Sequence, residues 1–193
     1  MGRQSKTFCE SGIFETGIGQ VAIVRYKGGG RIEIGVFLLD VFCLGVKNAF
    51  FHQCEGEEFD EFFSDLYSGS PVGEHSAAWG RKLVEGALRY ARKLGFAPHR
   101  DYKKAARVMG GIDPKDCPER FEYGQDGKPM FIGGPHDTQE KCHRIIRILT
   151  KKLGADGFHF LIPESEFDRL AMDEDCPDEN IVIEQVKVVD EES

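Results

Sequence analysis

Residues 20–43 read QVAIVRYKGGGRIEIGVFLLDVFC, and they give the clearest indication of the architecture. Gln20–Lys27 is rich in β-branched residues and is followed by three consecutive glycines, a pattern typical of a strand that ends in a turn. Arg31–Cys43 resumes with alternating apolar residues and is continuously apolar over Val36–Leu39. We therefore expect a β-hairpin that leads into a buried strand.

Helical periodicity dominates the sequence after this hairpin. Apolar residues recur at helical spacing in two segments, Glu57–Tyr67 and Glu74–Leu94. A short helix is expected over Tyr102–Met109, with Asp101 as its cap and Gly110-Gly111 at its end. A fourth helix is expected over Asp137–Leu153, with the aspartate as its N-terminal cap.

Three further segments are expected to be strands. Glu119–Tyr123 alternates aromatic and charged residues, and the Asp126-Gly127 turn signal would join it to a return strand at Pro129–Ile132. Phe158–Ile162 is a short apolar strand. Because strands and helices mix without a regular βαβ repeat, we predict an α+β fold with a mainly antiparallel sheet and helices packed on one face. An α/β three-layer architecture around a parallel sheet is the alternative.

The length and the charge suggest a domain with an appendage. The chain has 193 residues, and we expect a loosely ordered segment at 1–19, a single α+β domain over 20–162 and an acidic appendage with one strand over 163–193. The net charge is −8, but residues 164–193 alone hold twelve acids and two bases, so the remainder carries +2. The acidic balance therefore does not argue against a polyanionic partner.

The composition also indicates the compartment. No apolar run approaches the roughly 20 residues that cross a bilayer, and the polar N-terminus lacks the apolar core of a signal peptide. The six cysteines are widely spaced and include no CxxC pair, which is typical of free thiols in a reducing compartment. We expect a soluble, cytoplasmic protein with no membrane partner.

The segment 81–107 is strongly basic, because nine bases oppose only Glu85 and Asp101. The bases lie off the apolar stripe of the predicted helix, so they form either a solvated face or a face that binds the phosphates of a nucleic acid or a nucleotide. They are Arg81, Lys82, Arg89, Arg92, Lys93, Arg100, Lys103, Lys104 and Arg107.

Asp40 is the first candidate for chemistry, since it interrupts the apolar run that ends the hairpin. A buried carboxylate is costly unless it is paired or ligates a metal. Lys47 is a potential partner for it, and exposure of Asp40 at the end of the strand is the alternative.

The second candidate is the pair His99 and Asp101. A histidine two residues from an aspartate suits a general base with an orienting carboxylate, or two metal ligands. The alternative is that Asp101 caps the helix that follows and that His99 is a loop residue.

The third candidate is an anion site before the last predicted helix. Gly133 and Gly134 would let the backbone approach a ligand closely, at a helix start that favours anions. His136 and Lys128 would add positive charge. The alternative is a strand-to-helix connection in which the glycines serve the turn and Asp137 caps the helix.

Four segments also show a family likeness: GALRYA at 86–91, LGFAPHRDY at 94–102, YGQDGKP at 123–129 and GPHD at 134–137. They resemble an uncharacterised family of bacterial proteins, and the resemblance spans residues 20–162. It implies that the regions around His99 and Gly134 belong to one unit. The family has no established activity, so it supplies no catalytic roles.

These patterns together indicate a protein that binds or hydrolyses a phosphate-bearing partner. Metal-assisted phosphoester hydrolysis with a divalent ion would use four catalytic residues, Asp40, His99, Asp101 and Asp137. The anion would be held by Lys128, Gly133, Gly134 and His136. The alternative is a non-catalytic interaction module whose acidic C-terminus meets a basic protein. A separate hypothesis is that the acidic C-terminus covers the basic segment of its own chain.

Overall fold

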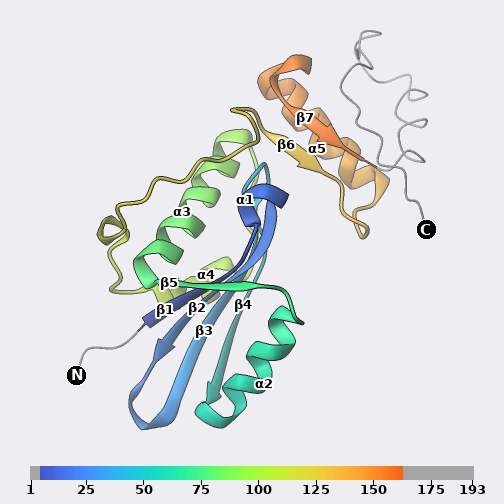
Figure 1. The fold of residues 1–193 in the computed structure, drawn as a ribbon. Coiled ribbons are helices and arrows are strands. Elements are labelled where there is room, and N and C mark those ends of the chain that lie inside the picture. Colours follow the sequence, from blue (N-terminus) through green and yellow to red (C-terminus); the bar gives the residue numbers. More distant parts are fainter. Residues whose placement is uncertain (1–4, 163–193) are drawn as a thin grey trace. The chain divides into compact units, whose positions relative to one another are not determined.

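The computed structural model describes residues 5–162, which fall into two compact units that divide between Tyr123 and Gly124 (Figure 1). The predicted single domain over 20–162 is therefore split after Tyr123. The segments around His99 and Gly134 lie in different units, contrary to what the family resemblance implies. The acidic appendage and strand expected at 163–193 lie outside the described residues.

The first unit is built on a five-stranded sheet with the order β4-β3-β2-β1-β5, in which every neighbouring pair of strands is antiparallel. The predicted α+β class with an antiparallel sheet is confirmed. The strands are β1 (Ser5–Glu10), β2 (Ile18–Tyr26), β3 (Arg31–Asp40), β4 (Gly45–Glu55) and β5 (Val72–Ser76).

The β2–β3 hairpin is the predicted one, and it forms the centre of the sheet. Its register runs from Ile18 opposite Asp40 to Tyr26 opposite Ile32. The turn contains Gly29, whose φ of 74° is left-handed and favours glycine. The β2 residues 21–24 are fully buried, because both faces of the sheet are covered.

Helices cover both faces of this sheet, not one as predicted. On one face, Ile32, Ile34 and Val36 form a core with aromatic residues of α2 (Gly56–Tyr67). Successive strand residues point to opposite faces, and a Cβ on Gly35 would collide with Ala105 and Val108. The second face is therefore covered by α4 (Tyr102–Ala105) and the 3-10 turn η2 (Ala106–Met109), together with α3 (Ala77–Leu94).

The N-terminal segment of the first unit contains more regular secondary structure than its sequence predicts. Residues 5–19 were expected to be loosely ordered, but they contain β1 and the short helix α1 (Ile13–Thr16). β1 is held because it pairs with β2 on one side and β5 on the other. Thr7 and Cys9 are buried, although the segment lacks the β-branched run that marks β2.

The predicted helix Glu74–Leu94 is correct only from Ala77 onward. Val72–Ser76 is strand β5, which pairs with β1. The Ser76 side chain then caps α3 by accepting a hydrogen bond from the Trp79 amide at 3.2 Å. β4 was not predicted at all, and it adds the edge strand beside β3.

The strand predicted at Glu119–Tyr123 is wrong, since these residues form no strand. Their side chains dock on α3 instead. The Trp79 indole donates to Glu119 at 2.7 Å, and the Tyr123 hydroxyl donates to the Leu83 carbonyl at 3.1 Å. Phe121 packs edge-on against the Trp79 ring. The alternation therefore reflects contacts with a helix and not pairing in a sheet.

The second unit contains helix α5 (Gln139–Leu153) and two short strands, β6 (Met130–Ile132) and β7 (His159–Leu161). β6 pairs with β7 in parallel, so it is not the return strand of a hairpin. The predicted turn at Asp126-Gly127 lies within an isolated β-bridge between Gln125 and Lys128 and does not join two strands. Within residues 5–162, no helix is both long enough and apolar enough to cross a membrane.

Candidate functional site: a basic surface on α3 and α4

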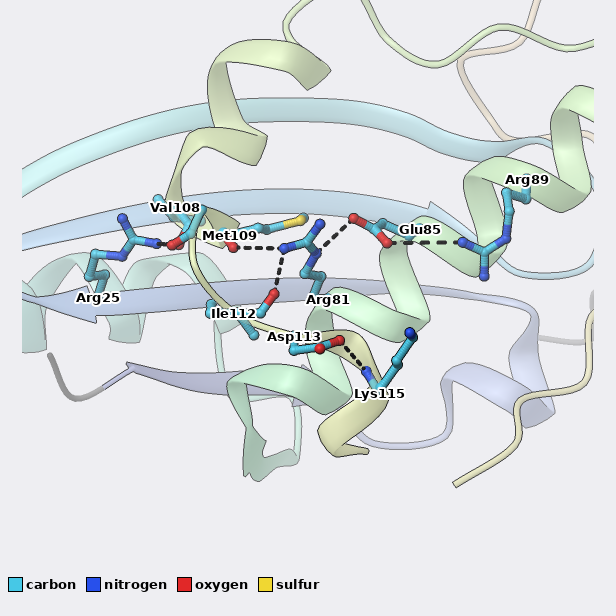
Figure 2. Close-up of polar contacts among 10 residues, drawn as sticks. Arg25, Arg81, Glu85, Arg89, Val108, Met109, Ile112, Asp113 and Lys115 are labelled. Carbon is cyan, nitrogen blue, oxygen red and sulfur yellow. Dashed lines mark hydrogen bonds and ion pairs between the residues drawn. The ribbon is translucent and has the colours of Figure 1, made fainter. Parts of the chain in front are cut away.

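Two arginines join the sheet and α3 to the end of η2 (Figure 2). Arg25 is buried in β2, and its guanidinium donates to the carbonyl oxygens of Val108 and Gly110. Carbonyl oxygens satisfy this buried cation in place of a carboxylate. Sequence reasoning missed Arg25, although a charged residue directly after four buried apolar residues was a signal.

Arg81 makes the equivalent connection from α3. Its guanidinium donates to the carbonyl oxygen of Met109 at 3.2 Å and to that of Ile112, and its Nε donates to Glu85 at 2.8 Å. Lys82 also has a hydrogen-bond partner within the fold, because its ammonium group donates to the Cys117 carbonyl at 2.7 Å. Two of the nine bases in segment 81–107 therefore hold the fold together.

The other seven bases of the segment are exposed. We call them the α3–α4 basic surface: Arg89, Arg92, Lys93, Arg100, Lys103, Lys104 and Arg107. Within the described part of the chain, only two of them approach a carboxylate, and both distances are long: Arg89 to Glu85 at 3.9 Å and Arg100 to Asp101 at 3.7 Å. The surface is therefore strongly positive.

Tyr102, the first residue of α4, lies within electrostatic range of three arginines of α3. Burial raises the pKa of the Tyr102 hydroxyl, and the charge of Glu85 raises it further. Three α3 arginines lie close enough to lower the same pKa, namely Arg92, Arg81 and Arg89. Arg89 and Arg92 of α3 therefore lie near the start of α4, where Lys103 and Lys104 directly follow Tyr102 in the sequence.

Asp40 is a structural carboxylate at the end of β3. It is 6% exposed and accepts hydrogen bonds from the amides of Phe42 at 3.0 Å and Cys43 at 2.7 Å, so it closes the turn into β4. Desolvation raises the pKa of Asp40 to about 6, against the lowering effects of these amides and of Lys47. Burial also raises the pKa of the Cys43 thiol, which disfavours its nucleophilic thiolate form.

His99 and Asp101 form the start of α4. The Nδ1 atom of His99 accepts a hydrogen bond from the Asp101 amide at 3.3 Å, and the His99 amide donates to the Val46 carbonyl at 3.0 Å. The Asp101 side chain makes no capping hydrogen bond, so it does not cap α4 as the sequence suggested. The carboxylate lies 3.9 Å from Nδ1, too far for a hydrogen bond that orients the ring.

The predicted anion site is filled by groups of the chain itself. Asp137 accepts a hydrogen bond from the Gly134 amide at 2.9 Å and pairs with Lys141. The Gly133 amide donates to the Leu161 carbonyl at 2.8 Å. Asp137 does not cap α5 as predicted, because Thr138 accepts from the Lys141 amide instead.

The remaining two members of that predicted site do not complete it. The Lys128 ammonium donates to the Asp156 carbonyl at 3.0 Å, and His136 is exposed. Among residues 5–162, no group of three or more His, Cys, Asp or Glu side chains is placed to hold a metal ion. The candidate catalytic residues Asp40, His99 and Asp101 share the first unit, and Asp137 belongs to the second.

Comparison with known proteins adds no relative to this description. No family model, no curated protein and no solved structure matches the chain. The resemblance to an uncharacterised bacterial family therefore rests on the quoted residues alone.

Proposed function

We propose that this protein binds nucleic acid through the α3–α4 basic surface. The observation that carries the proposal is that seven bases of segment 81–107 are exposed, whereas the same segment contains only two acids, Glu85 and Asp101. Arginine and lysine side chains in such a cluster are the groups that contact nucleic-acid phosphates.

The arrangement of charges on α3 supports a polyanionic partner over a simple solvated face. Arg89 lies three residues before Arg92 and four before Lys93, so like charges are neighbours on the helix surface. Each such pair destabilises a helix by about 0.2–0.5 kcal/mol. A solvated face normally mixes both signs, whereas a polyanion would relieve this repulsion.

A nucleic acid fits this surface better than an anionic membrane does. Helices that bind a membrane surface insert an apolar face beside their basic residues. The apolar face of α3 is buried against the sheet, through residues such as Leu83, Val84 and Ala87. Among the described residues of the first unit, the exposed large apolar ones are Phe14, Ile18 and Phe50, none of which belongs to α3 or α4.

Binding is also favoured over hydrolysis of the partner. Asp40 closes a turn, and the His99 ring accepts a hydrogen bond from the Asp101 amide, so both side chains have structural roles. A catalytic carboxylate or histidine has to reach the reacting atoms, and a metal-assisted reaction has to assemble several ligands in one place.

The test is a titration of the full chain against a labelled single-stranded oligonucleotide of about 30 nucleotides, followed by fluorescence anisotropy. The double variant Arg89→Gln/Arg92→Gln removes two exposed arginines of the surface. We expect at least about tenfold weaker binding at 0.1 M salt, because two phosphate contacts and their counterion release are lost.

The matched control is Arg31→Gln/Arg120→Gln, which removes two exposed arginines outside the surface. It should bind like the unmodified protein. Equal weakening in both double variants would contradict the proposal, since binding would then follow net charge alone. Repeating the titration with Mg²⁺ and Mn²⁺, and examining the oligonucleotide for cleavage, tests the hydrolytic alternative.

A further inference from the structure

The second unit carries an exposed basic stripe of its own on α5. The apolar residues of this helix are buried, among them Ile145, Ile146 and Leu149. Arg144, Arg147 and Lys151 are exposed. Their spacing of three and four residues places them on one side of the helix, away from the buried stripe.

This stripe is not neutralised by acids of the same helix. α5 contains five bases and a single acid, Glu140, which lies in its first turn. Lys141 pairs with Asp137, but no ion pair within the described part of the chain joins a carboxylate to the three stripe residues. Arg144, Arg147 and Lys151 therefore repel one another as successive neighbours, and the helix gains from a partner of opposite charge.

The chemistry of the stripe selects the class of partner. Two of its three members are arginines, whose planar guanidinium forks suit phosphate oxygens. The apolar side of α5 is already buried in the second unit, so it is not available for insertion into a lipid surface. A phosphate chain needs only the exposed cations.

We infer that α5 is a second nucleic-acid-binding surface, so that each unit of the protein contacts phosphates independently. This inference rests on the proposed function for its choice of partner. A strand long enough to engage both surfaces gains affinity from the second contact without any change in the first. A strand too short to do so uses one surface at a time.

The test compares the unmodified full chain with the triple variant Arg144→Gln/Arg147→Gln/Lys151→Gln on the oligonucleotide of about 30 nucleotides. We expect about tenfold weaker binding at 0.1 M salt or below, and a salt-dependence slope smaller by about 2, since a single strand loses about 0.7 per phosphate contact. The double variant Arg144→Lys/Arg147→Lys keeps the charge and should retain that slope. Matching thermal unfolding midpoints show that the variants are folded.

The outcomes separate this inference from the proposed function. Unchanged affinity and slope in the α5 triple variant, with weakened binding in Arg89→Gln/Arg92→Gln, would overturn the inference and leave the proposed function standing. Weakened binding in the α5 triple variant, with unchanged binding in Arg89→Gln/Arg92→Gln, would overturn the proposed role of the α3–α4 basic surface and leave the inference about α5 standing. Preferential binding of the unmodified protein to phosphatidylserine vesicles, lost in the α5 variant, would overturn the choice of nucleic acid.

Discussion

Asp40 and Arg25 are charged residues that lie buried in the first unit. The Asp40 carboxylate accepts hydrogen bonds from backbone amides, and the Arg25 guanidinium donates hydrogen bonds to backbone carbonyls. Burial of Asp40 has a consequence for stability, because its folded pKa of about 6 lies above the ordinary value of 3.8. The folded state then binds the proton more tightly than the unfolded state does. The contribution of Asp40 to the free energy of unfolding is therefore present at low pH and is lost as the pH rises through its folded pKa.

We expect the free energy of unfolding to fall between about pH 4 and pH 6 by up to about 3 kcal/mol because of Asp40. Asp40→Asn should remove that component of the pH dependence, since the amide does not titrate. Urea unfolding of both proteins across this range measures it. Parallel curves for the two proteins would show that the Asp40 carboxylate is not desolvated as described.

Arg25→Met should destabilise the fold by about 3 kcal/mol, because it leaves the buried carbonyl of Val108 without its donor and removes the hydrogen bond to the Gly110 carbonyl. Arg120→Met, at an exposed position, serves as the control and should change little. Chemical denaturation monitored by Trp79 fluorescence compares them. A loss at Arg25 no larger than at Arg120 would contradict the structural role of the guanidinium.

At the scale of elements, α3 is shaped by close contacts at its glycines. Gly86 faces the Tyr123 hydroxyl so closely that a Cβ would collide with it. Gly86→Ala should therefore lower the stability by about 1–3 kcal/mol, although alanine favours a helix over glycine. In α2, Gly56 has open space, so Gly56→Ala should stabilise by about 0.5 kcal/mol. Thermal unfolding of both variants should give shifts of opposite sign.

The elements that the sequence predicts well are those whose signal is local. The β2–β3 hairpin has β-branched residues on either side of three glycines, and α3 has a complete apolar stripe. β1 and β5 were missed because their residues are mostly polar and are held by pairing with each other and with β2. That pairing is a tertiary effect which no short window of sequence contains.

The candidate site was predictable to a similar extent. The cluster of bases in 81–107 was visible in the sequence, and the structure adds which of them are exposed. The roles of Asp40, His99 and Asp137 depended on which backbone amides come within reach of each side chain, and a residue pattern does not contain that information. Arg81 and Lys82 likewise looked like surface bases until their carbonyl partners were known.

At the scale of the whole molecule, charge is separated along the chain. Residues 164–193 carry −10 and the rest carries +2, and we expect the acidic C-terminus to compete electrostatically with a polyanion for the basic residues. Deleting residues 173–193 removes nine acids and one base. We expect the shortened protein to bind the oligonucleotide at least about threefold more tightly at low salt. Unchanged affinity would argue against competition by the acidic C-terminus.

The salt dependence of nucleic-acid binding by the unmodified protein reports directly on phosphate contacts made by the α3–α4 basic surface. If the seven bases of the α3–α4 basic surface contact phosphates, the logarithm of the binding constant should fall with the logarithm of the salt concentration, with a slope of about −5 for a single strand. Contacts from α5 would make the slope steeper. Absence of binding at low salt, or binding with a slope near zero, would contradict nucleic-acid binding by this surface.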